Sequence, residues 1–314
     1  MKVAMIETIG GSPKVVEIDA VKSEEGMVLL DVCAVALNPV DIAIASGKFF
    51  AGHPPLPFIP ALEAVAKVGG SRLVYAQGAG YGISRNGFLA QQVRAPEASL
   101  IDIPIESDPA IAVALGTAGL AGWLSVRWRA NVGINDVVVV LGATGAVGKV
   151  ALQAAKFAGA KRIIAVGRSE NRLMSSDVIA SSKVVIDDEL AKNVLEAAGE
   201  PPTVVIDMTW GSPLSSVLSV LAAGARVVQV GASASIEATI LSAPVRGKQL
   251  SILGYSNFGV PRDVLVNTYK EIVSLANAGK LSVPISKFPL TDLATAWSAA
   301  VNGEAKVVIE VDKN

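Results

Sequence analysis

The feature of this sequence that most constrains its fold is a glycine-rich turn between an apolar strand and a helix. Residues 136–142 read DVVVVLG, an apolar run typical of a strand buried on both faces of a parallel sheet. Gly142, Gly145 and Gly148 follow in the motif GATGAVG, and a helical stretch comes next. Glycine at these places permits a tight turn, close approach of the backbone to a pyrophosphate and close packing of the helix on the strand. The motif therefore predicts a dinucleotide-binding turn, although Ala143 stands where the commoner pattern has its first glycine.

Strands and helices alternate after this turn in units of about 30 residues, as in a series of βαβ units. The expected strands are RIIAVG, KVVID, TVVIDM, ARVVQVG and SILGY, at residues 162–167, 183–187, 203–208, 225–231 and 251–255. Right-handed crossovers predict a doubly wound parallel sheet with the strand order 3-2-1-4-5-6. Residues 251–255 would then form an apolar edge strand, through which we expect two copies to pair as a homodimer or within a dimer of dimers.

Composition excludes several classes of protein. Lys and Arg number 27 against 28 Asp and Glu, so the net charge of −1 argues against nucleic-acid binding. The hydrophobic fraction of 51% raises the question of a membrane span, but the longest uncharged stretch, residues 109–126, contains three glycines, and we expect no span. The N-terminus does not resemble a signal peptide. The single cysteine, Cys33, excludes an internal disulfide, and we expect a cytoplasmic protein.

The strand after the glycine-rich turn indicates which dinucleotide binds. A site for NAD places Asp or Glu about 20 residues after the turn, where the carboxylate binds the ribose hydroxyls. This chain has Gly167, Arg168 and Ser169 there, with Arg172 one turn further on. A guanidinium can pair with a 2′-phosphate, which a carboxylate would repel. The sequence therefore favours NADP(H).

Five stretches of this chain resemble the medium-chain dehydrogenase/reductase superfamily, and more narrowly its zinc-less quinone oxidoreductase branch. They are NPVDIAIASG (38–47), PFIPALEAVAKVG (57–69), GTAGLAGW (116–123), LGATGAVG (141–148) and the closing FPLTDLATAW…AKVVIEV. The resemblance spans essentially the whole chain. It implies an α/β fold with a Rossmann doubly wound parallel sheet and a GroES-like, partly open β-barrel domain. We expect the GroES-like domain at residues 1–112 and 258–314, and the Rossmann dinucleotide-binding domain at residues 113–257.

The same resemblance argues against zinc. Relatives that bind zinc have a cysteine at the position of Asn38, and a histidine in a Gly-His-Glu triplet that here reads Ala61, Leu62, Glu63. Because zinc needs about four nitrogen, sulfur or oxygen ligands, we expect no metal site. We expect Asp41 and Glu63 to be structural, as a cap or a buried hydrogen-bond partner.

Without a Lewis acid, the enzyme needs an acceptor that takes hydride easily, such as an apolar quinone or an α,β-unsaturated carbonyl. The developing oxyanion then needs a donor, and Asn38 is the candidate, since this position lies beside the nicotinamide in relatives. The tyrosine that such reductases often carry after the Ser-Gly pair is absent. Lys48, Phe49 and His53 are weaker substrate candidates, and Phe50 and Phe58 are candidate apolar walls of the pocket, with core packing as the alternative.

The remaining cofactor contacts follow from position in the family pattern. We expect Thr117 near the nicotinamide and Thr144, Gly145, Ala146 and Val147 at the pyrophosphate. The ends of later strands add Thr209, Gly231, Ala232 and Ser233.

Two alternatives to an NADPH-dependent reductase of quinones or enones stay open. One is a catalytically weak protein that binds NADPH and serves as a structural or interaction partner, because the tyrosine is missing. The other is an enoyl-thioester reductase, although no basic cluster for a coenzyme A phosphate stands out. The sequence names neither the physiological substrate nor a proton donor.

Overall fold

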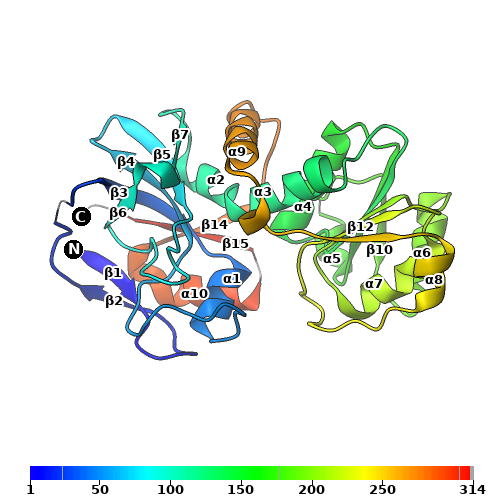
Figure 1. The fold of residues 1–314 in the computed structure, drawn as a ribbon, viewed down its shortest axis with the longest axis horizontal. Coiled ribbons are helices and arrows are strands. Elements are labelled where there is room, and N and C mark those ends of the chain that lie inside the picture. Colours follow the sequence, from blue (N-terminus) through cyan, green and yellow to red (C-terminus); the bar gives the residue numbers. More distant parts are fainter. Residues whose placement is uncertain (23, 176, 304, 312–314) are drawn as a thin grey trace. The chain divides into compact units, whose positions relative to one another are not determined.

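The structure is a computed structural model that describes residues 1–22, 24–175, 177–303 and 305–311. The chain forms two compact units (Figure 1). Unit 1 comprises Met1–Thr117 and Val266–Asn314, and unit 2 comprises Ala118–Leu265, so both boundaries fall a few residues beyond the expected ones after 112 and 257. Among the described residues, no helix is both long and apolar enough to span a membrane.

Unit 2 is built on a six-stranded parallel sheet. Its order, β10-β9-β8-β11-β12-β13, confirms the predicted 3-2-1-4-5-6 arrangement. The strands are β8 (Val137–Leu141), β9 (Arg162–Gly167), β10 (Ser182–Val185), β11 (Val204–Asp207), β12 (Arg226–Gln229) and β13 (Ser251–Gly254). All five residues of β8 are buried, because helices cover both faces of the sheet. The last strand, β13, pairs only with β12 among the described residues and so lies at the sheet edge.

The helices of unit 2 are short, and one feature of their packing depends on a glycine. They are α3 (Thr117–Leu124), which begins at the unit boundary, a π-helical turn (Ser125–Arg129), α4 (Ala146–Phe157), α5 (Glu170–Leu173), α6 (Leu190–Ala198), α7 (Gly211–Val217) and α8 (Ser242–Gly247). A side chain at Gly122 of α3 would meet Val147 O of α4 at 2.5 Å. Gly122, in the uncharged stretch 109–126, therefore serves close packing of α3 on α4.

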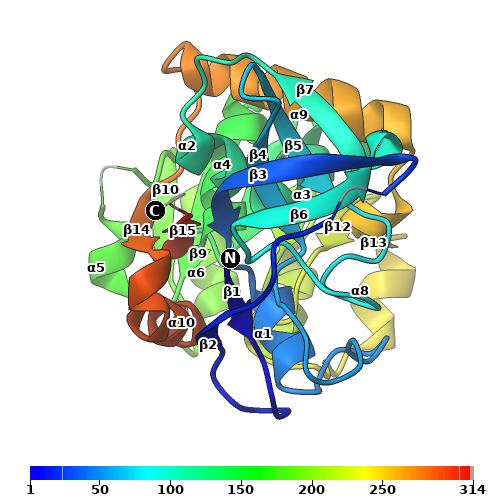
Figure 2. The same cartoon turned by 90° about the vertical axis from the view of Figure 1, so that its left-hand side faces the viewer.

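Unit 1 contains a bent seven-stranded sheet of the order β14-β15-β3-β4-β5-β7, in which β6 also pairs with β3. The strands are β3 (Met27–Ala36), β4 (Glu63–Val68), β5 (Arg72–Gln77), β6 (Gln92–Pro96), β7 (Leu100–Ile103), β14 (Ile285–Pro289) and β15 (Lys306–Glu310). The long strand β3 pairs with β6 along its first half and with β15 along its second, and its register against β4 shifts between Val32 and Ala34 (Figure 2). This sheet is the expected partly open barrel.

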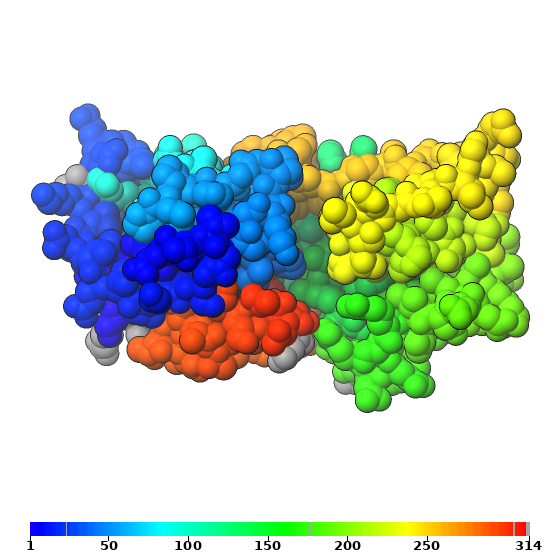
Figure 3. Space-filling model, turned by 90° about the horizontal axis from the view of Figure 1, so that it is seen from below, coloured from blue at the N-terminus to red at the C-terminus, as the bar shows by residue number. Residues whose placement is uncertain are grey.

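The remaining elements of unit 1 cover this sheet. A hairpin of β1 (Lys2–Met5) and β2 (Lys14–Glu17) contacts α10 (Leu293–Asn302), and the blue and orange-red surfaces of these segments lie side by side in Figure 3. The other helices are α1 (Pro39–Ala45), α2 (Pro109–Ala114) and α9 (Arg262–Asn277). Tyr269 of α9 stacks on Tyr75 of β5 with 4.1 Å between ring centroids and donates a hydrogen bond to Ala112 O at 2.8 Å. These contacts fix α9 to the sheet and to α2.

The glycine-rich turn gives a test of the packing in unit 2. A Cβ at Gly148 would clash with Gly142 O and lie 2.7 Å from Ala143 Cα, both of them backbone atoms. We therefore expect Gly148→Ala to lower the free energy of unfolding of the protein by about 1–3 kcal/mol in urea denaturation. Gly247→Ala on α8 is the matched control, because nothing lies within 4 Å of its Cβ position. Equal stability of the two variants would contradict this packing.

Candidate active-site elements

The backbone of the turn after β8 is arranged to receive an anion. Gly142 has a φ of +85°, and the amides of Gly142 and Ala143 both donate to Val166 O at 3.0 Å, which ties the turn to β9. Gly145 is the N-cap of the twelve-residue helix α4 and offers no side-chain cap. The first amides of a helix lack intrahelical acceptors, so they are available to a bound phosphate.

The space beside this turn also suits a dinucleotide. A Cβ at Gly145 would come no closer to the surrounding chain than 3.6 Å, at Gly142 O, so the turn is open on that side. Of the amides predicted to bind the pyrophosphate, that of Gly145 donates to Gly142 O at 3.2 Å, and those of Thr144, Ala146 and Val147 belong to this open segment. The residues present therefore fit the pyrophosphate of a dinucleotide.

The residues after β9 lie next to the turn. Arg168 and Arg172 are both exposed. Ser169 caps α5, and its hydroxyl oxygen accepts a hydrogen bond from Arg172 N–H at 3.4 Å. The guanidinium of Arg172 reaches back to Thr144 O at 3.5 Å. The structure thus brings the arginine of α5 to the glycine-rich turn, as a site for a 2′-phosphate requires.

The expected contact Thr209, after β11, is held by a buried carboxylate that sequence reasoning missed, and backbone hydrogen bonds join its loop to the loop after β12. Asp207 Oδ1 accepts hydrogen bonds from the N–H and the hydroxyl of Thr209, each at 2.7 Å. Burial raises the pKa of Asp207. Ser233 N–H donates to Met208 O at 3.0 Å, so the loop containing Gly231, Ala232 and Ser233 lies against the loop containing Thr209. The only signal in the sequence is an acid at the end of an apolar strand.

A second group of polar residues lies inside unit 1, and all of them except the half-buried Thr117 are buried. We call it the Glu63 cluster, and it consists of Asn38, Asp41, Glu63, Tyr75, Thr117 and Lys306. Glu63 itself is fully buried. Its Oε2 accepts from Tyr75 OH at 2.7 Å, from Thr117 N–H at 2.6 Å and from Thr117 Oγ1 at 2.9 Å. A side chain at Gly116 would clash with this oxygen and lie 2.7 Å from Tyr75 OH, so glycine is needed there.

The other carboxylate oxygen of Glu63 faces Asn38 and Lys306. Asn38 Nδ2 donates to Glu63 Oε1 at 2.7 Å, and Lys306 Nζ lies 3.7 Å from the same oxygen. Lys306 Nζ also donates to Asn38 Oδ1 at 2.6 Å. Burial lowers the pKa of Lys306, while Glu63 and Asp41 oppose that shift.

Asn38 is the N-cap of α1, and Asp41 in the first turn of the helix forms a capping box with it. Asp41 Oδ2 accepts from Asn38 N–H at 2.7 Å, and its Oδ1 accepts from Leu62 N–H at 3.0 Å. Burial raises the pKa of Asp41 to about 7, and nearby Glu63 adds to this, against the Asn38 N–H and Lys306. Asp41 and Glu63 thus make contacts of the structural kind that we expect of them.

The expected substrate residues lie elsewhere in unit 1. Lys48 is exposed, Phe49 is partly buried and Phe50 is 91% exposed. His53 has its Nδ1 2.7 Å from Pro54 O. Phe58 is buried in the core, which is the alternative to a place in the pocket wall.

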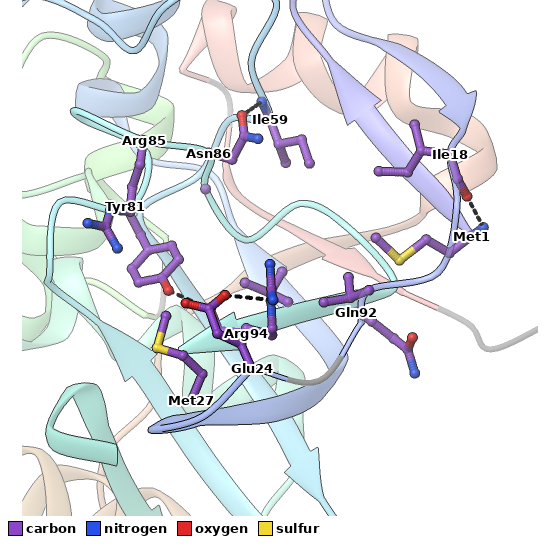
Figure 4. A pocket seen from close by; sticks show the side chains of 13 residues that line it. Met1, Ile18, Glu24, Met27, Ile59, Tyr81, Arg85, Asn86, Gln92 and Arg94 are labelled. Carbon is purple, nitrogen blue, oxygen red and sulfur yellow. Dashed lines mark hydrogen bonds and ion pairs between the residues drawn. The ribbon is translucent and has the colours of Figure 1, made fainter. Parts of the chain in front are cut away.

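Unit 1 also has a hollow of about 520 Å³, which none of these five residues lines (Figure 4). Its walls include Met1, Ile18, Met27, Tyr81 and Arg94.

The positions of the zinc ligands in relatives hold other groups here. Asn38 is engaged by Lys306 and Glu63, and Leu62 is a core residue with 2% exposure. Cys33 is apart from them, and its thiol donates to Asp31 O at 3.7 Å. Within the described ranges, His, Cys, Asp and Glu side chains nowhere gather in threes in a way that could hold a metal ion.

The raised pKa of Asp41 gives a pH-dependent test. Between its usual pKa near 3.8 and about 7, folded Asp41 keeps a proton that the unfolded chain releases. The stability that the folded state gains from holding this proton is therefore lost as the pH rises through that window. The stability of the wild type should fall over this range, whereas Asp41→Asn has no such titration. We therefore expect the free energy of unfolding of Asp41→Asn, relative to that of the wild type, to increase by up to about 4 kcal/mol from pH 4 to pH 8. The exposed Asp188→Asn serves as control, and a pH-independent difference between Asp41→Asn and wild type would contradict the assignment.

Known proteins with similar sequences agree with a dinucleotide-binding unit joined to a second domain. A family described as zinc-binding dehydrogenase matches residues 146–278. The quinone oxidoreductase of Homo sapiens is 26% identical over 291 residues, which cover 89% of this chain and 87% of that protein. A mycocerosic acid synthase-like polyketide synthase of Mycobacterium tuberculosis is 26% identical over 313 residues, 93% of this chain but 14% of that protein.

A solved structure extends the likeness to the whole fold. The quinone oxidoreductase of Thermus thermophilus, described together with its NADPH complex, superposes with a TM-score of 0.82 at 26% identity. The match covers 99% of this chain and 100% of that one. The parallel sheet, the separate mixed sheet and these relatives together confirm the resemblance seen in the sequence. The chain is an oxidoreductase of the medium-chain dehydrogenase/reductase superfamily and belongs to its quinone oxidoreductase-like branch.

Proposed function

We propose that this protein is an NADPH-dependent, zinc-independent reductase that transfers a hydride to a quinone or to an α,β-unsaturated carbonyl. The observation that carries the proposal is an open pyrophosphate turn with two arginines after the next strand. Arg172 reaches Thr144 O of this turn at 3.5 Å, and Arg168 is exposed at the end of β9. The Thermus thermophilus relative, whose structure includes an NADPH complex, supports this choice of cofactor.

Each part of the cofactor has candidate partners in the chain. The amides of Thr144, Ala146 and Val147 would bind the pyrophosphate, which Gly145 lets approach closely, and Arg168, Ser169 and Arg172 would bind the 2′-phosphate. The loops with Thr209 and with residues 231–233 stand at the carboxyl ends of parallel strands, where such sheets bind ligands. Asn38 and Thr117 of unit 1 remain the candidates for the nicotinamide end. When bound, NADPH supplies the hydride.

The Glu63 cluster supports zinc independence. Asn38 Oδ1 already accepts from the Lys306 ammonium at 2.6 Å, and a buried cation so close opposes binding of a divalent cation. Leu62 provides no ligand atom. With no Lewis acid to polarise an ordinary ketone, the acceptor must itself take hydride readily, as a quinone or the β-carbon of an enone does.

The proton that completes the reduction comes, in this proposal, from solvent. The hydroxyls of Tyr75 and Thr117 and an N–H of Asn38 are all directed at Glu63. These three donors of the Glu63 cluster are therefore engaged internally. A catalytically weak NADPH-binding protein is the alternative that this observation keeps open.

An enoyl-thioester reductase is the second alternative. It is favoured by the polyketide synthase relative, one segment of which matches 93% of this chain. Thioester-linked enones share the activated double bond of free enones, so the two proposals differ in the substrate carrier and not in the hydride step.

We also propose that the protein is a cytoplasmic dimer joined through β13. Ser251 N–H and Tyr255 N–H point toward β12, so the alternate residues Ile252 and Gly254 direct their backbone groups to the open edge. Ile252 is 37% exposed. Arg129 Nε covers one of these groups, Gly254 O, at 3.0 Å. The outward groups of Ile252 stay available for antiparallel pairing with a second copy.

Exchange of Arg168 tests the choice of cofactor. Arg168→Asp places a carboxylate where a 2′-phosphate would bind and removes a charged hydrogen bond. We expect the Kd for NADPH to rise about tenfold to a hundredfold, with the Kd for NADH unchanged or lower, in fluorescence titrations. Arg246→Asp, which reverses an exposed charge on α8, is the control. Equal affinity of the wild type for NADPH and NADH would refute the assignment.

A substrate panel tests the reaction. NADPH oxidation is followed optically with quinones, free enones, an enoyl thioester and a saturated ketone, each with and without EDTA. We expect turnover of quinones or enones, none of the ketone, no loss of rate with EDTA and no stoichiometric zinc by elemental analysis. Preference for the thioester would establish the second alternative. Rate loss on chelation that zinc restores would overturn zinc independence, and binding without turnover would leave the catalytically weak protein.

A further inference from the structure

Hydrogen bonds within the chain decide which backbone groups the edge of β13 has left. Residues 252 and 254 direct their N–H and C=O groups away from β12, because alternate residues of a strand bond to opposite sides. Arg129 Nε donates to Gly254 O at 3.0 Å, so this carbonyl already has a donor. Just before the strand, Leu250 N–H donates to Val245 O at 3.0 Å. Among the described residues, Ile252 is thus the one on this edge whose N–H and C=O are both left for a second chain.

An N–H and a C=O on the same residue suit a symmetric partner. When two copies of a strand pair antiparallel about a two-fold axis, the residue at the axis faces its own copy. A directly opposed pair that exchanges both hydrogen bonds uses the N–H and the C=O of one residue from each strand. Ile252 meets this requirement, and no charged residue lies between Lys248 and Arg262 to repel its copy across the axis.

We infer that two copies of this chain pair through β13 with Ile252 opposite Ile252 at the two-fold axis, and that Arg129 excludes a neighbouring register. This inference rests on the proposed dimer and assigns which residues meet in it. In this register Gly254 N–H of each copy faces Leu250 O of the other. The reverse bond of that pair is not needed, because Leu250 N–H is held by Val245 and Gly254 O by Arg129. Each outward backbone group from residue 250 to residue 254 therefore has a partner.

The two neighbouring registers leave groups of Ile252 unpaired. If Ile252 faced Gly254 of the second copy, its N–H would compete with Arg129 for Gly254 O. If it faced Leu250, its C=O would meet an N–H that Val245 O already holds. Either register leaves one group of Ile252 in each copy without a partner at the centre of the interface, where an unsatisfied polar group is costly.

Arg129 reaches the edge from the π-helical turn Ser125–Arg129. Trp128 of the same turn packs edge-on against Tyr255, directly after β13, with 6.4 Å between the ring centroids. This contact fixes the turn beside the end of the strand, so the guanidinium of Arg129 is held where it meets Gly254 O. The chain thus carries its own donor for the one carbonyl that the neighbouring register would require.

Single cysteines report the register. The native cysteine, Cys33, is first replaced by serine. Ser251→Cys, Ile252→Cys and Leu253→Cys are then compared by oxidation with copper phenanthroline, and covalent dimers are followed on non-reducing gels. Directly opposed Cα atoms lie about 5.5 Å apart, within reach of a disulfide, whereas diagonal neighbours lie about 7–8 Å apart. We expect Ile252→Cys to cross-link about tenfold faster than either neighbour.

A second set of variants tests Arg129. Arg129→Ala frees Gly254 O and so removes the obstacle to the register in which Ile252 faces Gly254. We expect Leu253→Cys, which stands at the axis of that register, to approach the cross-linking rate of Ile252→Cys in this background. Arg127→Ala is the matched control, because Arg127 lies in the same turn but directs its Nη1 to the last residue of α4. Thermal unfolding and light scattering of each variant establish that it is folded and dimeric.

The outcomes separate this inference from the proposed function. A dimer in which Ser251→Cys or Leu253→Cys cross-links fastest would overturn the assigned register while pairing through β13 stands. No gain for Leu253→Cys in Arg129→Ala would overturn the role of Arg129. A dimer that none of the three cysteines cross-links would overturn both the register and the interface. A monomeric wild type in light scattering would end the proposed dimer, and this inference with it, whereas the proposed reductase activity is measured separately with the substrate panel.

Discussion

A carboxylate buried completely inside a protein is costly unless donors or cations surround it, and Glu63 meets this condition with hydrogen-bond donors from three segments of the chain and a cation from a fourth. Asn38 comes from the start of α1, Tyr75 from β5, Thr117 from the start of α3, and Lys306 from β15. These segments are far apart in the sequence. Removing Glu63 would leave all of these donors without their shared acceptor, so the arrangement of unit 1 around it depends on this one group.

The same contacts that stabilise Glu63 restrict the chemistry of its neighbours. Tyr75 and Thr117 direct their hydroxyl hydrogens to Glu63, and Asn38 directs an N–H to it. The cluster is thus rich in polar groups but poor in free donors. The proposal that solvent supplies the proton follows from this one set of hydrogen bonds.

The sequence predicted unit 2 well and the polar interior of unit 1 poorly, for physical reasons. Apolar strands such as β8, and glycines such as Gly148 where only a hydrogen fits, leave local patterns that specify a parallel sheet and its turn. The Glu63 cluster has no local pattern, because Lys306 reaches Asn38 across 268 positions of the chain. Asn38 could be singled out by resemblance, but its inward-facing donors depend on partners that only the folded chain brings together.

The measurement that tests the central claim most directly follows the hydride itself. NADPH deuterated at C4 of the nicotinamide, in each of its two stereoisomers, is incubated with the protein and an enone, and the product is analysed by mass spectrometry. The account predicts that one stereoisomer delivers its deuterium to the β-carbon and that the α-carbon gains a proton from solvent. Reduced product without deuterium from either stereoisomer would contradict direct hydride transfer from NADPH.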